Sequence, residues 1–319
     1  MNMIQLKEKF NNYNISRYRL AYYEIMYDRY HCNLFEYLDY IKKNKSIKNI
    51  IISKDNIVME FDVCGILVKL VLGYKNPLSL PLYIFDTGSY EENETKIIME
   101  CVKENDTILD IGANIGIYTI LLNKYKNCTT YSFEPIKYTF NLLKKNVKVN
   151  NVNAKIYNVG LSDKNKVEKF YFNHKEIGAS SMRDIREDKE NTSILKCNVM
   201  KLDDFIEKEG ITNIDFIKID IEGAELFALM GGGMNIKKHK PIIFCEILRK
   251  WTKKFDYHPN DIINLLKSFG YVCYAIKENI IEKIYKITDD TIETNFLFLD
   301  KNKQRHKDII NKLSLGKYK

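Results

Sequence analysis

The chain has 319 residues, of which 45% are hydrophobic and 29% are charged, and its formal net charge is +8 at pH 7. These proportions are ordinary for a folded protein and exclude an intrinsically disordered chain. No apolar run approaches the length of a membrane span. The chain is also longer than a minimal α/β domain needs, so we expect a core domain with an extension.

The cysteines and the first residues indicate the cellular compartment. The seven cysteines are scattered along the chain and form no C-x-x-C pair, which disfavours a disulfide framework or a zinc knuckle. The first ten residues, MNMIQLKEKF, lack the apolar core of a secretion signal. We therefore expect a cytoplasmic protein with reduced thiols.

The positive charge has two interpretations. The 50 basic residues are interspersed with 42 acidic ones, and no long basic block occurs. This favours a general bias of composition. The alternative is attraction to an anionic partner such as nucleic acid, a nucleotide-linked sugar or an anionic glycan.

The first 85 residues are expected to form an extension of helices and short strands. Residues 1–45 carry aromatic and aliphatic residues at helical spacing, from Phe10 through Tyr18 and Tyr22 to Tyr40. Such a stripe needs burial, either against the rest of the chain or against a second subunit. A homodimer formed through these helices is therefore one hypothesis.

The pattern of residues 49–85 differs from the helical pattern before it. These residues read as short strands that are interrupted at Lys54–Asn56 and at Val63–Gly65. The pair Asn76–Pro77 then predicts a turn.

Residues 86–302 alternate between helix and strand patterns, which predicts a doubly wound, mostly parallel sheet with helices on both faces. The expected strands are 107–113, 129–135, 154–163, 166–172, 195–200, 214–220, 241–247, 271–278 and 294–300. The last two should form an antiparallel edge. Residues 303–319 are expected to be a basic C-terminal tail or helix.

The strongest signal is TILDIGANIGIYTILL at Thr107–Leu122. An apolar strand ends in Asp110 and passes through a turn, Gly112-Ala113-Asn114, into a helix that begins near Gly116. Ligands bind at such turns in doubly wound sheets. Asn114 replaces the second glycine of the G-x-G-x-x-G pattern, which disfavours a dinucleotide. The Asp110 carboxylate could instead contact the cationic end of S-adenosylmethionine.

Two later strand ends extend this cofactor site. Glu134 and Pro135, in YSFEP, end the second strand, and an acidic residue at this position can accept hydrogen bonds from both ribose hydroxyls. The third strand leaves through YNVGLSD, which contains Gly160 and should pass beside an adenine ring. These residues complete the predicted cofactor site.

A second acidic cluster follows in DFIKIDIEGAE. Asp220, Glu222 and Glu225 lie at the end of a buried strand, where carboxylates are costly unless they are solvated, paired or functional. Glu246 ends the next strand, PIIFCEI. These acids are therefore candidates for the reacting centre.

Together, LDIGANIG, FEP, DFIKIDIEGAE, PIIFCEI and TNFLFLD resemble the FkbM family of methyltransferases over about residues 89–300. The resemblance implies a class I, Rossmann-like methyltransferase fold with a seven-stranded sheet. It implies methyl transfer from S-adenosylmethionine to an oxygen, usually a hydroxyl of a sugar or other natural product.

Residue by residue, the resemblance assigns roles to the motifs. The turn residues Asp110, Gly112, Asn114 and Gly116 match the family's first cofactor loop, and Glu134 matches its ribose-binding acid. The acids of the second cluster match the D-x-E-G-x-E motif that borders the methyl site.

Methyl transfer to a hydroxyl needs a base or a metal within hydrogen-bond reach. Asp220 is the first candidate, and it is also expected to border the cofactor. The other predicted catalytic residues are Glu222 and His174, the latter in a segment, FNHKEIGASSM, that could form a substrate lid. The predicted acceptor-binding residues are Ser180, Glu225 and Glu246.

Further candidates are His239 and His258. Glu222 and Glu246 could hold a divalent metal, but no H-x-x-x-H or H-x-E spacing requires one. Whether a metal takes part therefore stays open.

We expect an S-adenosylmethionine-dependent O-methyltransferase that acts on a sugar, a glycan or a related small molecule, which could be nucleotide-linked. One alternative is an RNA or protein methyltransferase, including N-methylation. The Asn/Asp-Pro-Pro-aromatic loop expected of a base amino methylase is missing, and nucleic acid is the less favoured partner. The other alternative is a non-catalytic association protein that keeps the fold.

Overall fold

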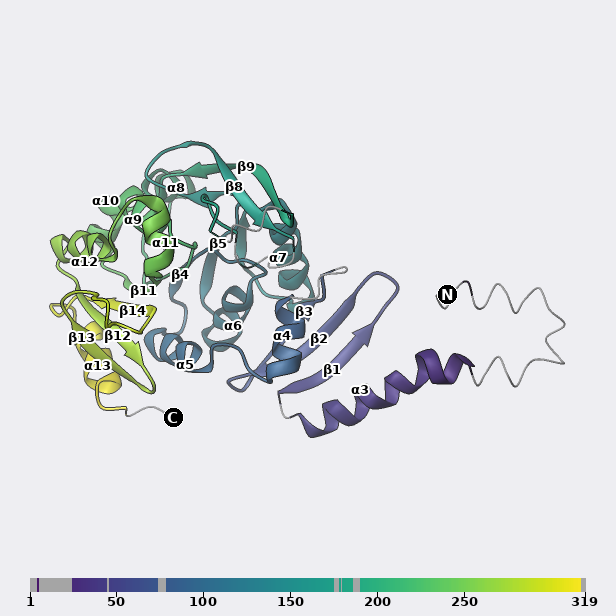
Figure 1. Cartoon of the computed structure of the whole chain (residues 1–319). Coiled ribbons are helices and arrows are strands. Elements are labelled where there is room, and N and C mark those ends of the chain that lie inside the picture. Colours follow the sequence, from purple (N-terminus) through teal and green to yellow (C-terminus); the bar gives the residue numbers. More distant parts are fainter. Residues whose placement is uncertain are drawn as a thin grey trace, which may run out of the picture.

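A twisted eight-stranded sheet forms the centre of the computed structural model, which describes residues 5, 25–44, 46–73, 79–174, 178, 180–185 and 190–316 (Figure 1). Its strand order is β13-β12-β14-β11-β10-β4-β5-β6. The strands are β4 (Thr107–Ile111), β5 (Thr129–Phe133), β6 (Lys155–Tyr157), β10 (Phe216–Ile219), β11 (Ile242–Glu246), β12 (Val272–Lys277), β13 (Ile280–Ile284) and β14 (Asn295–Leu299).

The expected doubly wound, mostly parallel α/β sheet is confirmed. Strands β6, β5, β4, β10 and β11 run parallel, while β14 pairs antiparallel with β11 and β12. The parallel strands are continuous apolar runs because both of their faces are covered. In β10, for example, Phe216 belongs to the core on one face and Ile217 to the core on the other.

Two details of the sheet differ from the expectation. The sheet has eight strands rather than seven, because Ile280–Ile284 forms a hairpin with β12 at the edge. In addition, β14 lies inside the sheet between β11 and β12. The apolar run NFLFL is buried at four of its five residues, whereas the more polar IIEKI is mostly exposed. Burial therefore decides which strand takes the edge.

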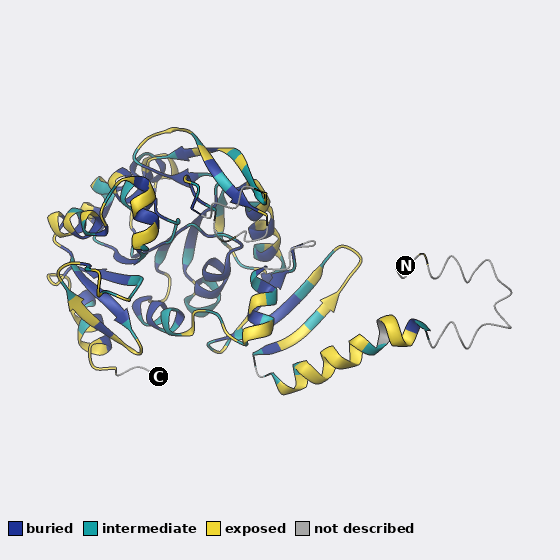
Figure 2. Ribbon diagram, viewed as in Figure 1, coloured by how far each residue is buried: buried dark blue, intermediate teal, exposed yellow. Residues whose placement is uncertain are grey.

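Helices cover both faces of the sheet, and each group has its own hydrophobic core (Figures 1 and 2). One core includes side chains of α5 (Glu92–Cys101), α6 (Ile117–Lys126), α7 (Lys137–Asn150) and α13 (Gln304–Leu313). The other includes side chains of α8 (Leu202–Glu209), α9 (Glu225–Gly231), α10 (Gly233–His239) and α12 (Pro259–Ser268).

Three smaller structures complete the body. A second, mixed sheet consists of β7 (Gly160–Leu161), β8 (Lys166–Asn173) and β9 (Thr192–Met200); β9 pairs in parallel with β7 and antiparallel with β8. The short helices α11 (Arg249–Thr252) and η2 (Lys253–Phe255) follow β11. In the part of the chain that the structure describes, no helix is both long enough and apolar enough to cross a bilayer.

A three-stranded antiparallel sheet precedes the central eight-stranded sheet in the chain. It consists of β1 (Ile47–Ile52), β2 (Ile57–Val63) and β3 (Ile66–Val71), whose turns fall at the two interruptions expected from the sequence. The amide of Asn150 in α7 exchanges two hydrogen bonds with the backbone of Lys69, at 2.9 and 2.6 Å. These contacts fix β3 along α7. The next helix, α4 (Leu80–Thr87), replaces a stretch that was expected to be extended.

Helix α3 (Cys32–Lys43) follows the π-helical turn η1 (Tyr27–His31) and projects from the body (Figure 2). None of the residues 32–43, all of which the structure describes, is buried. Tyr37, in the middle of α3, packs edge-on against the Phe85 ring, and the Tyr40 hydroxyl donates a 2.9 Å hydrogen bond to the Phe85 carbonyl oxygen. The part of the aromatic stripe that lies on α3 therefore packs little on the rest of the described chain. Phe10, Tyr18, Tyr22 and the turn at Asn76–Pro77 lie outside the described residues.

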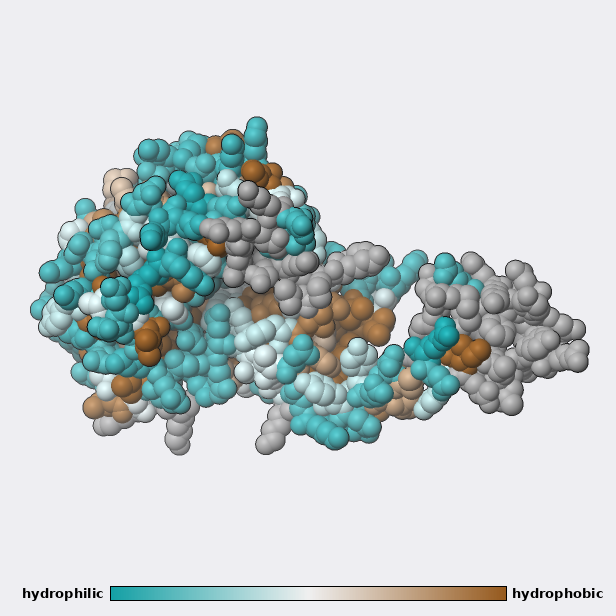
Figure 3. Space-filling view, in the orientation of Figure 1, coloured by the Kyte–Doolittle hydropathy of each residue, from teal (hydrophilic) through white to brown (hydrophobic). Residues whose placement is uncertain are grey.

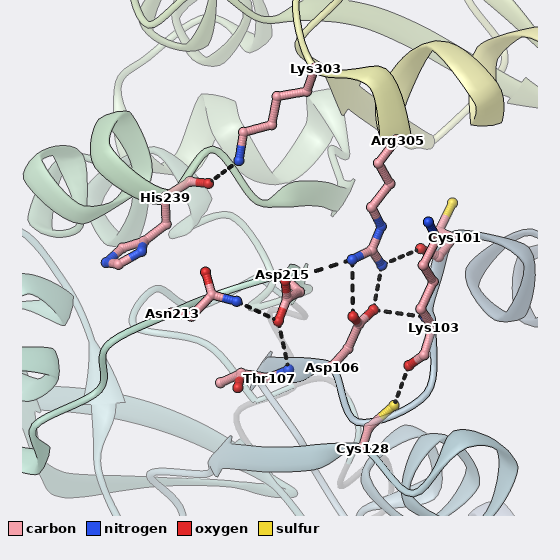
Figure 4. A network of polar contacts seen from close by, with 10 residues as sticks. All are labelled: Cys101, Lys103, Asp106, Thr107, Cys128, Asn213, Asp215, His239, Lys303 and Arg305. Carbon is pink, nitrogen blue, oxygen red and sulfur yellow. Dashed lines mark hydrogen bonds and ion pairs between the residues drawn. The ribbon is translucent and has the colours of Figure 1, made fainter.

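A buried ion-pair network ties α13 to the amino-terminal edge of the central sheet (Figure 4). Arg305 Nη1 donates a 2.9 Å hydrogen bond to Asp106 Oδ1 and lies 3.7 Å from Asp215 Oδ1. The Cys101 carbonyl oxygen accepts a further hydrogen bond from Arg305 Nη2 at 2.8 Å. Asp215 Oδ2 in turn accepts the Thr107 N–H at 2.9 Å. One guanidinium thus connects α13 with the residues that precede β4 and β10.

Candidate active site

A pocket opens at the carboxyl-terminal edge of the parallel strands. Nine of the residues predicted from the sequence line it, namely Gly112, Ala113, Asn114, Glu134, Pro135, Gly160, Ser180, Asp220 and Glu222. Five others, Asp110, Gly116, His174, Glu225 and Glu246, lie outside its lining. The loops after β4, β5 and β10 therefore meet where a doubly wound sheet is expected to bind its ligand.

The first turn is shaped by close packing between two loops. Gly112 has a φ of +81°, and a Cβ atom there would lie 2.0 Å from the Asp220 carbonyl oxygen. The glycine thus lets the β4 and β10 loops pack closely together, and it also lines the pocket. A Cβ atom at Gly116 would lie 2.3 Å from Leu143 Cδ1, so this glycine lets α6 pack against α7.

Asp110 lies beneath the turn and is buried. Its Oδ2 accepts a 2.6 Å hydrogen bond from the Thr119 hydroxyl, whereas Oδ1 has no hydrogen-bond partner among the described residues. Burial raises the pKa of Asp110, although the nearby Lys218 ammonium opposes this effect. The carboxylate is therefore placed to influence the pocket through charge rather than to form part of its wall.

Glu134 is held by the backbone on both oxygens. Oε2 accepts the Asn114 N–H at 3.1 Å, and Oε1 accepts the Ile136 N–H at 2.8 Å. Burial raises the pKa of Glu134 to about 7 even though these hydrogen bonds favour the charged form. Asn158, which the sequence did not single out, donates from Nδ2 to the carbonyl oxygens of Glu134 and Pro135, at 2.9 Å each. The orientation of this carboxylate is thus fixed before any ligand binds.

Lys218 is the main functional candidate that sequence reasoning missed. Its Nζ lies 3.1 Å from Asp220 Oδ2 and 5.4 Å from the centre of the Tyr118 ring. Burial alone would lower the pKa of Lys218, but the carboxylates of Asp220, Asp110 and Glu91 hold it above its usual range. A lysine in the middle of a fully buried strand is the signal that could have identified it, because such a charge needs partners.

Asp220 and Glu246 form a carboxyl pair, since β10 and β11 are neighbours in the sheet and their side chains hydrogen-bond to each other. Burial alone would raise the pKa of Asp220, but the Lys218 ammonium lowers it. Burial and the adjacent Asp220 charge raise the pKa of Glu246 far above its usual range. These opposite shifts favour the negative charge on Asp220 and the proton on Glu246, which can donate its hydrogen bond to the Asp220 carboxylate.

Two tyrosines and a further acid complete this end of the pocket. Tyr90 and Tyr118 line it, and the Tyr118 hydroxyl donates a 2.7 Å hydrogen bond to Glu91 Oε2. Burial raises the pKa of both tyrosines well above the usual value. They remain neutral hydroxyl groups that can donate or accept hydrogen bonds.

The two remaining acids of the second cluster have different positions. Glu222 lines the pocket with a φ of +54°. Glu225 is buried, and its Oε1 accepts the N–H groups of Ile221 and Gly223, at 3.0 and 3.1 Å. Tyr257 donates to Oε2 at 3.3 Å. Glu225 therefore supports the loop that carries the pocket residues, whereas an acceptor-binding role was expected.

The three candidate histidines lie outside the pocket lining. His174 is exposed, and its Nε2 is 2.7 Å from the Ser193 hydroxyl. His258 caps α12, and His239 lies at the opposite edge of the sheet (Figure 4). The segment between β8 and β9 lines the pocket as a lid would, through Gly178, Ser180 and Met182. Among the described residues, no group of three His, Cys, Asp or Glu side chains could hold a metal ion.

Two curated proteins are similar in sequence to part of this chain. The chain is 28% identical over 148 residues to "Methyltransferase 1" of Beauveria bassiana, which covers 40% of this chain and 59% of that protein. It is 23% identical over 158 residues to the AMB antimetabolite synthetase AmbE of Pseudomonas aeruginosa, covering 39% of this chain and 7% of that protein. The chain thus spans less than two thirds of the length of either relative.

Among solved structures, methyltransferase FkbM from Methylobacillus flagellatus aligns with a TM-score of 0.40 and 18% identity, covering 62% of this chain and 44% of that one. The sequence model of the methyltransferase FkbM domain matches residues 110–273, just over half of the chain. This segment runs from the first acid of the β4 turn to the start of β12 and includes the loops after β4, β5 and β10. The chain therefore belongs to the methyltransferase FkbM domain family.

Proposed function

We propose that this chain transfers the methyl group of S-adenosylmethionine to a hydroxyl of a sugar, a glycan or a related small natural product. The observation that carries the proposal is that one pocket is lined by two kinds of polar group. Glu134 follows β5, Lys218 and Asp220 belong to the end of β10 and the loop after it, and all three line the pocket. A nucleoside needs the first kind of group and proton transfer needs the second.

The residues present fit the cofactor. Each Glu134 oxygen uses one lone pair on a backbone N–H, which leaves acceptor capacity for ribose hydroxyls. Ile136, Leu161 and Phe170 offer an apolar wall for an adenine ring. The acidic groups near the β4 turn suit a cationic amino-acid end and would repel a pyrophosphate.

When bound, S-adenosylmethionine supplies an electrophilic methyl group. The protein's contribution is to orient the acceptor hydroxyl and to receive its proton. Asp220 carries the free charge of the carboxyl pair, so we assign proton acceptance to its carboxylate. Lys218 keeps that carboxylate ionised, and the proton on Glu246 fixes its orientation. Tyr90 and Tyr118 can position the acceptor through their hydroxyl groups.

The first prediction tests the cofactor. Calorimetry should show that S-adenosylhomocysteine binds and that NAD binds weakly or not at all. Glu134→Gln should weaken S-adenosylhomocysteine binding by about tenfold, because it removes the charge that accepts hydroxyl protons. The control is Glu207→Gln, an exposed position on α8, which should leave the affinity unchanged. Tight NAD binding without S-adenosylhomocysteine binding would refute the proposal.

The acceptor requires a separate experiment. Methyl-labelled S-adenosylmethionine should transfer label to at least one member of a panel of nucleotide sugars and oligosaccharides. If label were transferred only to RNA or only to protein, that macromolecule would replace the sugar or glycan as the proposed acceptor. Cofactor binding without transfer to any class would favour the association protein considered from the sequence.

The second prediction concerns assembly. We propose that the chain forms a homodimer through α3 and the neighbouring sheet. Leu34 and Leu38, four residues apart on α3, are 56% and 46% exposed, and Ile52 on β1 is 67% exposed. Hydrophobic side chains gather over the β1–β2 hairpin on the face shown in Figure 3. Apolar surface of this kind gains from burial against a partner.

Light scattering should give twice the 37.6 kDa chain mass for the intact protein and the monomer mass for the Leu34→Gln/Leu38→Gln variant. The control, Glu36→Gln/Lys43→Gln, should remain dimeric because it changes only exposed polar groups of the same helix. A monomeric intact protein would contradict this prediction.

A further inference from the structure

A second hollow lies between α7 and the turn that joins β1 to β2. It encloses about 1000 Å³, and four lysines, Lys54, Lys144, Lys145 and Lys148, are among its lining residues. Its floor is aliphatic and includes Ile57 and Leu142. We call this hollow the lysine groove. Lys145 Nζ lies 3.5 Å from Asn56 Oδ1, so the two walls approach each other at this contact.

The lysine groove is an uncompensated positive surface. Residues 135–162, which include all of α7, contain five lysines and no aspartate or glutamate, although the whole chain has 42 acids in 319 residues. Among the lining residues that the structure describes, Asp55 is the only acid. Within the described residues, none of the four groove lysines forms an ion pair, whereas Lys96 and Lys166 elsewhere are paired with Glu92 and Glu168. Such a surface attracts an anionic ligand.

The lysine groove and the candidate active site meet at the start of α7. Ile136 lines the active-site pocket, and Tyr138, two residues later, lines the groove. The Tyr138 ring centre lies 5.8 Å from that of Phe172 on β8, and Phe170 of the same strand lines the pocket. A ligand that is long enough could therefore contact both sites.

We propose that the lysine groove binds the acidic part of an extended acceptor, a carboxylate-bearing oligosaccharide, whose reacting hydroxyl lies in the active-site pocket. This inference rests on the proposed methyltransferase function. The aliphatic floor can pack against sugar rings while the lysines neutralise carboxylates. A single-stranded nucleic acid would favour a series of stacking aromatics. Tyr138 is the only aromatic residue in the groove lining that the structure describes.

The test uses a fluorescent oligogalacturonide as the probe and the full chain as the binder. The Lys144→Gln/Lys145→Gln/Lys148→Gln variant should bind the probe at least about tenfold more weakly at about 0.15 M salt, because three cations leave the groove. The matched control, Lys238→Gln/Lys301→Gln/Lys307→Gln, removes the same charge from exposed positions on α10, just before α13 and on α13. It should change the affinity by less than about twofold. Neutral dextran oligosaccharides should bind neither variant nor the parent measurably.

Three results would overturn the inference: an unchanged affinity in the groove variant, an equal loss in the control variant, or equal binding of the neutral oligosaccharide. Tighter binding of poly-uridylate than of oligogalacturonide, lost in the groove variant, would assign the groove to nucleic acid instead. S-adenosylhomocysteine affinity, measured in parallel, should be the same in all three proteins. If none of the three proteins bound S-adenosylhomocysteine, the methyltransferase proposal would be refuted, but the groove measurement would remain valid.

Discussion

Asp220→Asn should lower the rate of methyl transfer at least roughly 10²-fold, the usual range for loss of general acid–base catalysis. The substitution keeps the size of the side chain and removes the charge that would accept the hydroxyl proton. Cofactor affinity should change by less than about tenfold, or roughly 1.4 kcal/mol. The rate is measured with labelled cofactor on the acceptor found in the panel, and the affinity by calorimetry with S-adenosylhomocysteine.

The competing explanation is that Asp220 only stabilises the loop before α9. The structure gives that task to Glu225, whose carboxylate accepts the Ile221 and Gly223 N–H groups. Glu225→Gln should therefore lower the melting temperature more than it lowers the rate per folded molecule, which makes it the control. A near-normal rate for Asp220→Asn would remove Asp220 from the catalytic residues.

Arg305→Met should destabilise the fold by about 3 kcal/mol, because it leaves the Asp106 and Asp215 carboxylates near each other without their shared cation. Both acids pair with this one guanidinium, whose side chain is 19% exposed. The melting temperature should fall by roughly 5 °C or more. Thermal and urea unfolding monitored by circular dichroism would measure the change.

The matched control is Lys312→Met on the same helix. Lys312 pairs with Glu100, but its side chain is 44% exposed, so water screens the pair. The loss there should be below about 1 kcal/mol. Equal losses for the two variants would show that the buried network adds no more than a surface ion pair. Cofactor binding by the folded fraction of both variants should stay normal, since α13 lies at the edge of the sheet opposite the pocket.

The sequence alone determined the class of fold because the relevant signals are local. Strands such as β4 and β10 are apolar runs bounded by turns, and that pattern follows from burial on both faces. The turn at Gly112 and Asn114 and the acids at the strand ends were identified in the same way. All three features depend on residues close together in the chain.

Strand order and edge position could not be predicted in this way. The sequence placed the last strands at an antiparallel edge, but β14 lies inside the sheet and β13 takes the edge. This arrangement depends on which strand buries more apolar surface against the helices. That comparison involves segments far apart in the chain.

Only the tertiary structure decided how the charged residues are grouped. Lys218 lies beside Asp110 because β10 and β4 pair in parallel, and Asp220 meets Glu246 because β11 is the other neighbour of β10. Burial then makes these charges interact strongly and places a proton on one acid of the pair. The tertiary structure also places the Glu225 carboxylate where it accepts hydrogen bonds from the loop before α9. One side of α7 remains exposed and forms a wall of the lysine groove. Sequence patterns fix which side chains lie at strand ends, whereas strand register and burial fix their partners and their protonation.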